Sequence, residues 1–353
     1  MDSPFKFLDA YEKDDKDRFF GRTREIARLY NALHASNIVM LYGASGTGKT
    51  SLINCGLANK FYDTDWLPIF IRRGDGIMGS IYRELEKVAG EDSLKGIDDL
   101  SDQIQTLYKE HYRPIYLIFD QFEELHVLGT QKEQKTFNKA IAKLLKAGLP
   151  CKILISIREE YIAYLSEMEK MVPSLFDNRI RIERMNDVNL YRVVSGTAKE
   201  ANIKIATPRK TVPTIIKNIR IPGFGVELAH LQIYMDKLYK KDVRRRKRKK
   251  EDRQIRFDSY LVGKGKQLEG VISDFIDEQM KVLQAELLEK GIEDMQLPWN
   301  ILFELVTDDG TKLNVEVDAL KGRLFQKRDI DPEITEFCVN RLNELKVIRM
   351  LPT

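Results

Sequence analysis

Short apolar runs of strand length alternate with helical patterns through the first part of the chain. The apolar runs occupy residues 38–42, 66–72, 114–119, 151–157 and 179–184. Apolar residues recur at helical spacing over residues 50–59, 132–146 and 187–200. This alternation is typical of an α/β domain in which helices cover both faces of a sheet. We therefore predict a five-stranded, mainly parallel sheet in a domain over residues 19–205, with a lead-in over residues 1–18.

A glycine-rich motif joins the first apolar run to the following helical pattern. It has the form G-x-x-x-x-G-K-[ST] in the strand-to-helix context that a phosphate-binding loop requires. Its glycines let successive backbone N–H groups point at phosphate oxygens, and the helix N-terminus adds partial positive charge. Lys49 is expected to hold the β- and γ-phosphates, and the Thr50 hydroxyl to ligate Mg²⁺. The predicted nucleotide-binding residues of this loop are Gly43, Ala44, Ser45, Gly46, Thr47, Gly48, Lys49, Thr50 and Ser51.

A carboxylate follows the third apolar run. Asp120 comes directly after residues 114–119, at the strand end where parallel sheets bind their ligands. An aspartate there is expected to bind Mg²⁺ through its water shell, together with Thr50. Glu123 or Glu124 is then the predicted general base for the attacking water, and their spacing does not choose between them. The alternative is a polar strand end followed by a solvated acidic helix start.

Another strand separates the glycine-rich motif from Asp120 in sequence, since residues 66–72 lie between them. This insertion is the organisation of P-loop ATPases that carry an added catalytic glutamate, and it argues against kinases and small GTPases. The fourth run ends in Arg158, which is expected to sense the γ-phosphate, with a structural ion pair as the alternative. The fifth run alternates arginine with apolar residues, which suits an edge strand. None of its arginines is assigned as an arginine finger.

Composition limits the class of protein further. A hydrophobic fraction of 43% can build substantial cores, and 353 residues favour two or three domains. Three widely separated cysteines provide neither a disulfide framework nor zinc-ligand spacing. The first residues lack the pattern of a secretion signal, and no apolar run approaches the ~20 residues that cross a bilayer. We expect a soluble, cytoplasmic protein.

The net charge of +4 is unevenly distributed. Residues 240–250 hold nine basic residues and one acid, a local charge of +8, so the rest of the chain carries −4. A protein that binds nucleic acid over a whole basic face is therefore disfavoured. We interpret residues 241–258 as a basic linker or loop. The alternative is that residues Arg244 to Lys250 bind the phosphate backbone of a nucleic acid. A membrane is not expected as a partner, because no apolar anchor adjoins the tract.

Together these motifs resemble the STAND ATPases, the group that contains the NACHT and NB-ARC proteins. The sequence Phe-Phe-Gly-Arg-Thr-Arg-Glu-Ile starts at Phe19, about twenty residues before the glycine-rich motif. The Asp-Gln-Phe-Glu-Glu sequence from Asp120 and the strand ending in Arg158 match bacterial members of the group. The resemblance implies a slow ATPase that binds ATP or ADP with Mg²⁺. It also implies that Phe20, Gly21 and Arg22 lie near the adenine and ribose.

The resemblance further implies a small helical domain and then a winged helix. The pattern agrees in outline, since residues 208–218 and 227–240 suit two helices of a small domain over residues 206–240. A winged-helix-like domain over residues 259–353 would use three helices and a wing strand, for which the candidates are residues 266–289, 298–305, 332–345 and 347–351. An unspecified helical bundle is the alternative.

Two features depart from the family pattern. The segment from Gly225 to Gln232 lacks the usual Gly-x-Pro, and His230 within it is interpreted as a packed histidine. No histidine follows His230, so a later histidine that reaches the β-phosphate of ADP is missing. The chain also has little sequence before Phe19 for an effector domain and no internal repeat that would serve as a sensor.

These observations predict a molecular switch that self-associates in its ATP state, in bacterial signalling or antiviral defence. Sensor and effector modules are expected on further sequence or on a partner protein. One alternative is an AAA+-like ATPase that handles DNA and contacts it through the winged helix and the basic tract. A second alternative is a scaffold that binds nucleotide without hydrolysing it.

Overall fold

The computed structural model describes residues 4–263, 268–306, 313, 315–345, 347–348 and 350. They fall into two compact units. The first, which we call the sheet unit, comprises residues 10–216 and 225–228. The second, the helical unit, comprises residues 4–9 and 217–224 and the described residues from 229 onward. The lead-in predicted over residues 1–18 is therefore divided between the two units.

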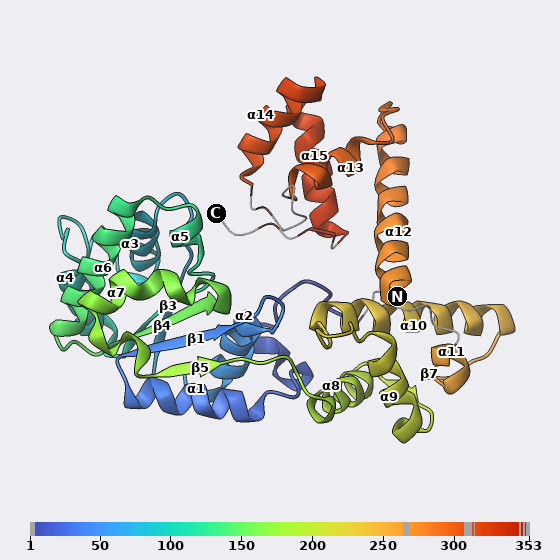
Figure 1. Ribbon diagram of the computed structural model, residues 1–353, viewed down its shortest axis with the longest axis horizontal. Coiled ribbons are helices and arrows are strands. Elements are labelled where there is room, and N and C mark those ends of the chain that lie inside the picture. The colour runs from blue at the N-terminus through green and yellow to red at the C-terminus, as the bar shows by residue number, and fades with distance from the viewer. Residues whose placement is uncertain are drawn as a thin grey trace. The chain divides into compact units, whose positions relative to one another are not determined.

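A five-stranded sheet forms the centre of the sheet unit, in the order β2-β3-β4-β1-β5 (Figure 1). All four strand pairs are parallel. Its strands are β1 (Ile38–Gly43), β2 (Leu67–Ile71), β3 (Ile115–Phe119), β4 (Cys151–Arg158) and β5 (Arg179–Arg181). The predicted α/β class, strand number and edge position of β5 are confirmed. The strand inserted after the glycine-rich motif is β2, at the opposite edge.

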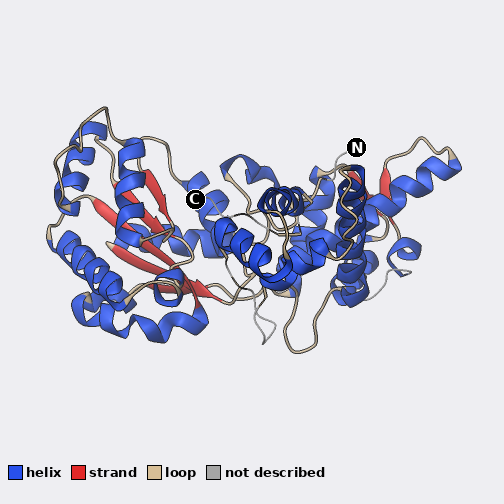
Figure 2. Ribbon diagram, turned by 90° about the horizontal axis from the view of Figure 1, so that it is seen from above, coloured by secondary structure: helices blue, strands red, loops and turns tan. Residues whose placement is uncertain are grey.

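Helices cover both faces of this sheet, as Figure 2 shows. Alternate residues of β1 enter different cores, because successive strand side chains point to opposite faces. Ile38 and Met40 pack in the core beneath α3, α4, α6 and α7, whereas Val39 and Leu41 pack in the core that includes α1. The helices on the two faces are α1 (Thr23–Ala35), α3 (Ile77–Val88), α4 (Leu100–His111), α5 (Glu124–Val127), α6 (Gln131–Lys146) and α7 (Ser166–Met171). Shorter 3₁₀ segments occur at Lys13–Arg18, Glu159–Leu165 and Pro173–Phe176.

The helix that follows the glycine-rich motif is wound unevenly. Its first turn is α2 (Lys49–Ser51), and it continues as a π-helix over Leu52–Leu57 and a 3₁₀ turn over Ala58–Lys60. Gly56 lies inside the π-helical part, and a β-carbon there would lie only 2.7 Å from Ile26 Cγ1 on α1. The predicted helix over residues 50–59 is confirmed, with this wider winding as a feature that the hydrophobic pattern does not reveal. The sheet unit then ends with α8 (Asp187–Glu200), β6 (Ile203–Ile205) and most of α9 (Pro208–Asn218).

The helical unit contains most of α10 and a compact helical cluster. Its elements are α10 (Leu228–Lys249), β7 (Ile255–Phe257), α11 (Ser259–Gly263), α12 (Leu268–Glu289), α13 (Leu297–Glu304), α14 (Val317–Arg328) and α15 (Pro332–Glu344). Apolar side chains of α12, α13, α14 and α15 form one core, which includes Leu283, Ile301, Leu324 and Cys338. No helix among the described residues is both long and apolar enough to cross a bilayer.

The winged helix stays a prediction. The three expected helices are present as α12, α13 and α15, and α14 is an additional helix that its weak apolar pattern did not predict. Val347, Ile348 and Met350 are not in a strand, and the other two residues of the predicted wing, Arg349 and Leu351, lie outside the described residues. Helices α12 to α15 of this region share one core, an arrangement that the helical-bundle alternative also allows.

Two predicted segments need correction. Residues 206–240 are not a separate domain, because α9 as far as Ile216 groups with the sheet unit and α10 from Ala229 groups with the helical unit. The basic tract is not a linker or loop, because α10 continues through it to Lys249. Its one acid, Asp242, is fully buried and forms ion pairs with Arg245 and Arg253 at 2.9 Å and 2.8 Å. Those contacts order the tract, and cations near a helix C-terminus are favourable.

Candidate functional site

The glycine-rich motif forms a loop between the carboxyl end of β1 and α2. Gly46 and Gly48 have φ values of +73° and +86°, a backbone region that other residues rarely adopt. A β-carbon on Gly43 would lie 2.3 Å from the backbone oxygen of Ile182, so only glycine fits there. The Thr47 hydroxyl donates to the Ala44 carbonyl at 2.9 Å, which closes the loop on itself. This backbone has the conformation that can bind a chain of phosphates.

Lys49 lies against its own loop. Its Nζ donates to the backbone oxygens of Gly43 at 2.8 Å and Ala44 at 3.1 Å. Burial lowers the pKa of Lys49, and the charges of Glu123 and Asp120 oppose this shift. The lysine is thus half-buried, surrounded by acids and able to move its ammonium group from carbonyl oxygens to phosphate oxygens.

Thr50 and Asp120 meet at the ends of two elements, α2 and β3. Thr50 Oγ1 donates to Asp120 Oδ2 at 2.9 Å, and Ser156 Oγ of β4 donates to Asp120 Oδ1 at 2.9 Å. A hydroxyl and a carboxylate in contact at a phosphate-binding loop are the oxygen ligands that Mg²⁺ prefers. The two residues predicted as metal ligands are therefore brought together and fit the ion.

The two glutamates after Asp120 occupy different surroundings. Glu123 contacts Arg158, whose Nε lies 2.9 Å from Glu123 Oε1. Glu124 is also buried; burial raises its pKa, and the charge of Arg72 opposes that shift. Of the acids, Glu123 has the strongest effect on the pKa of Lys49 in the phosphate-binding loop, whereas the strongest charge acting on the pKa of Glu124 is that of Arg72. Gln121, which directly follows Asp120, has a φ of +57°, a turn that the sequence did not reveal.

Arg72 is a site residue that the sequence analysis missed. It follows the last residue of β2, and its Nη2 lies 3.2 Å from Asp120 Oδ2. The next residue, Arg73, is directed to Glu133 instead, at 2.9 Å. Arg72 is the polar residue at the carboxyl end of the inserted strand, and the same argument that selected Arg158 at the end of β4 would have selected it.

The segment Phe20-Gly21-Arg22 contacts the phosphate-binding loop through Arg22. Arg22 is buried, and its Nη2 donates to the backbone oxygens of Thr47 and Glu183, both at 2.8 Å. Phe20 packs against Gly196 of α8, where a β-carbon would lie 2.7 Å from its ring. Arg22 thus supports the loop directly, a role that the resemblance did not specify.

A short segment before α10 lies over the same loop. A β-carbon on Gly46 would lie 3.9 Å from the carboxyl carbon of Glu227, and one on Gly48 would lie 3.5 Å from Leu228 Cδ1. Glu227 Oε1 also forms an ion pair with Arg184 Nη1 at 3.4 Å. An acidic side chain therefore lies next to the loop that is built to bind anions.

Two predicted residues of the loop have other surroundings. Ser45 is exposed, and the Ser51 hydroxyl accepts a hydrogen bond from the backbone N–H of Tyr11 at 3.1 Å. Ser51 thus fixes the lead-in to α2. His230, interpreted as a packed histidine, lies in α10 and is half-buried.

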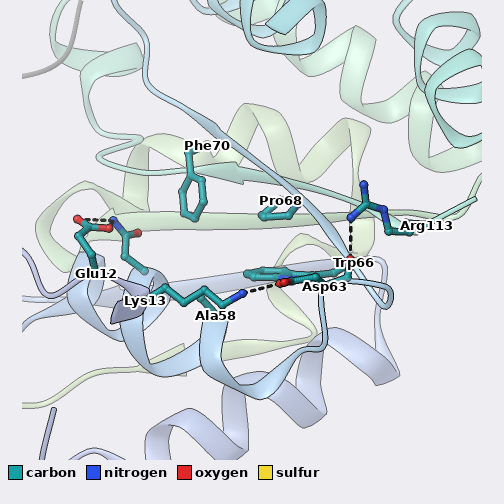
Figure 3. Close-up of a pocket in the computed structure, with 9 residues that line it drawn as sticks. Glu12, Lys13, Ala58, Asp63, Trp66, Pro68, Phe70 and Arg113 are labelled. Atoms are coloured by element: carbon teal, nitrogen blue, oxygen red, sulfur yellow. Dashed lines mark hydrogen bonds and ion pairs between the residues drawn. The ribbon is translucent and has the colours of Figure 1, made fainter. Parts of the chain in front are cut away.

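A separate cavity of about 240 Å³ lies beside the edge strand β2 (Figure 3). Trp66, Pro68 and Phe70 provide its apolar wall, and Lys13 and Asp63 form an ion pair at its rim. None of the predicted site residues lines it. Leu67 donates its backbone N–H to the carbonyl of Pro114, the residue before β3, so the backbone of residue 68 faces the open edge of the sheet. Proline at that position has no N–H to offer a further strand.

Comparison with known families identifies the chain. The model of the family described as novel STAND NTPase 1 matches residues 4–348. The chain belongs to this family. It is therefore a P-loop NTPase, as the loop, Asp120 and the sheet order predicted. No curated protein sequence matches the chain significantly.

Three solved structures are similar to this novel STAND NTPase, and the first of them reaches a TM-score of 0.50. The Walker-type ATPase paby2304 of Pyrococcus abyssi is 13% identical, with a TM-score of 0.50, over 97% of this chain and 93% of that protein. The Aeropyrum pernix ORC1 protein in complex with DNA is 14% identical, with a TM-score of 0.47, over 94% of this chain and 85% of that protein. The Aeropyrum pernix ORC2 protein in its ADPNP–ADP complexes is 14% identical, with a TM-score of 0.48, over 94% of this chain and 87% of that protein. At 13% identity the likeness to paby2304 concerns the fold alone.

Proposed function

We propose that this NTPase is an ATP-dependent molecular switch that hydrolyses ATP slowly and self-associates in its ATP state. Its biological setting would be bacterial signalling or antiviral defence. Nucleotide binding would change the position of the segment that leads into α10, and this change would alter the surface available for association.

The observation that carries the proposal is the position of Glu227 beside the phosphate-binding loop. Its carboxyl carbon lies 3.9 Å from where a β-carbon of Gly46 would be, and Leu228, the first residue of α10, packs near Gly48. Phosphates bound to this loop would carry negative charge close to that carboxylate, and like charges at such distances repel. The free energy of the segment in its position beside the loop, relative to a position away from it, would therefore depend on the bound nucleotide. Such a dependence is the requirement for a ligand-driven switch.

The hydrolytic roles follow from the same geometry. Lys49 would hold the phosphates, while Thr50 and Asp120 would hold Mg²⁺, which offsets the charge of the transferred phosphoryl group. Glu123 would accept the proton of the attacking water, because its contact with Arg158 holds its carboxylate beside the carboxyl end of β4. Arg158 contacts Glu123, so contact of Arg158 with the γ-phosphate would couple the presence of that phosphate to the position of the glutamate.

Light scattering tests this function. The molar mass of wild-type protein and of Lys49→Ala is measured with ADP, with ATP and with an ATP analogue that resists hydrolysis. We expect a larger mass for the wild type with ATP or the analogue than with ADP, and no such increase for Lys49→Ala. A wild-type protein that binds ATP but keeps one mass in every state would refute the switch while leaving the NTPase intact.

A second candidate function, nucleic-acid handling, is favoured by the end of α10. Lys241, Arg244, Lys247 and Arg248 are exposed there, and all lie on one ordered helix. Such a cationic helix would bind phosphate backbones with strong dependence on salt. Fluorescence anisotropy with a labelled DNA duplex, on wild type and on a variant with Arg244, Lys247 and Arg248 changed to Gln, tests this. Equal, weak binding by both proteins at low salt would exclude it.

A further inference from the structure

Arg72 carries a positive charge at the magnesium-binding carboxylate. Its Nη2 lies 3.2 Å from Asp120 Oδ2, and its side chain is only 17% exposed. Its second terminal nitrogen, Nη1, is buried and has no hydrogen-bond partner among the described residues. A buried guanidinium nitrogen without a partner is costly, so a second position in which that nitrogen is bonded would be favourable.

Asp120 has its acceptor capacity largely used by this arrangement. Ser156 donates to Oδ1, and both Thr50 and Arg72 donate to Oδ2. Thr50 and Oδ2 are the groups expected to hold Mg²⁺, so Arg72 occupies the metal-facing side of the carboxylate. A guanidinium and a divalent cation that are held by the same carboxylate, directly or through the water shell of the metal, repel each other.

Glu124 provides the second position. Its carboxylate is buried, and after burial itself the charge of Arg72 is the strongest influence on its pKa. Arg72 thus contacts Asp120 at the metal site and also interacts electrostatically with Glu124. A shift of the guanidinium toward Glu124 would keep its charge compensated and release Asp120.

We propose that Arg72 competes with the divalent cation for Asp120 and thereby sets the Mg²⁺ concentration at which nucleotide is bound productively. Metal binding would displace Arg72 from Asp120 Oδ2 toward Glu124. Arg72 is a positioning residue in this account, because it acts through Asp120. The inference rests on the proposed roles of Thr50 and Asp120 as metal ligands.

The test measures Mn²⁺ binding by electron paramagnetic resonance in the presence of ADP. We expect Arg72→Gln to bind Mn²⁺ about 10- to 100-fold more tightly than wild type, since the competing charged hydrogen bond is removed. Arg72→Lys, which keeps the charge, should stay closer to wild type. Arg73→Gln is the matched control, because Arg73 is directed to Glu133 and should leave Mn²⁺ affinity unchanged.

Folding and site assignment are controlled separately. Binding of a fluorescent ADP in EDTA should be the same for wild type and Arg72→Gln, which shows an intact loop. Equal or weaker Mn²⁺ affinity in Arg72→Gln, with ADP binding intact, would overturn the Arg72 proposal alone. Absence of Mn²⁺ binding in wild type and in all variants would overturn it together with the metal-site assignment.

Discussion

Arg158 contacts Glu123 through both its side chain and its backbone. Its Nε lies 2.9 Å from Glu123 Oε1, and its backbone N–H donates to Glu123 Oε2 at 3.2 Å. Both carboxylate oxygens are thus occupied by the last residue of β4. This contact connects the end of β3, where the acids lie, to the end of β4, and it holds Glu123 in one orientation.

The first prediction separates the two glutamates. Glu123→Gln should lower the rate of ATP hydrolysis by about 10²- to 10⁴-fold, the usual contribution of a general base, while nucleotide binding persists. Glu124→Gln should have a smaller effect, because the strongest charge acting on the Glu124 carboxyl is that of Arg72. Phosphate release and fluorescent nucleotide binding are measured on both variants. A greater loss of turnover in Glu124→Gln would reverse the assignment.

The second prediction concerns the support of the loop by Arg22. Arg22→Ala removes two hydrogen bonds from a buried guanidinium to the carbonyls of Thr47 and Glu183. Affinity for ADP should fall about 10- to 100-fold, because charged hydrogen bonds contribute about 1.5–3 kcal/mol. Isothermal titration calorimetry measures this, with exposed Arg24→Ala as the control. Equal affinities of the two variants would contradict the role.

The third prediction uses a pair of glycines. Gly43→Ala places a β-carbon 2.3 Å from the Ile182 backbone oxygen, so the loop must shift and the sheet unit should lose about 1–3 kcal/mol of stability. Gly79 lies in α3 with nothing within 4 Å of its β-position. Gly79→Ala should stabilise the unit by about 0.5–1 kcal/mol. Urea unfolding is followed by Trp66 fluorescence in a Trp299→Phe background, and it distinguishes a decrease from an increase in the free energy of unfolding. A Gly43→Ala protein as stable as the background protein would contradict the packing argument.

The fourth prediction concerns Asp242 in the helical unit and its dependence on pH. Burial alone would raise the pKa of Asp242, but hydrogen bonds from the Arg253 side chain and the Arg256 backbone N–H outweigh it and hold the pKa below its usual value. A carboxyl whose folded pKa is lowered stabilises the fold fully above its unfolded pKa of about 3.9, and this contribution is lost as pH falls through the folded value.

Asp242→Asn should therefore destabilise the helical unit by about 3 kcal/mol at pH 7, and the difference from wild type should shrink below pH 4. The estimate is at the low end for a broken buried ion pair, because Arg245 and Arg253 each keep a second acidic partner. Thermal unfolding followed by Trp299, in Trp66→Phe protein, reports on this unit. A difference that stays constant from pH 7 to pH 3 would contradict the ion-pair account.

The sequence was sufficient for the parts of the molecule with strong local signals. The buried strands ending in Asp120 and Arg158 were readable because apolar runs and their terminal polar residues define both the strand and its end. The presence of an inserted strand, β2, between the glycine-rich motif and Asp120 also followed from the order of motifs. The contact of Thr50 with Asp120 could be expected because both lie at the same edge of a parallel sheet.

Other features depend on contacts between distant residues. The basic tract is helical where Asp242 forms an ion pair with Arg253, a residue eleven positions later. Counting charges cannot show that contact, and the charge count alone favoured a loop. Arg22 and Glu227 reach the phosphate-binding loop through the folded chain, and no local pattern indicates either contact. The wing strand could not be assessed in the same way, because part of residues 347–351 lies outside the described residues.

Hydrogen–deuterium exchange over residues 225–232 tests the central claim most directly. The exchange is compared without nucleotide, with ADP, and with a hydrolysis-resistant ATP analogue, each nucleotide with Mg²⁺. We predict protection of residues 43–51 by both nucleotides, and faster exchange over residues 225–232 with the ATP analogue than with ADP. Protection of the loop by both nucleotides with identical exchange over residues 225–232 in all three states would contradict a switch that acts through Glu227.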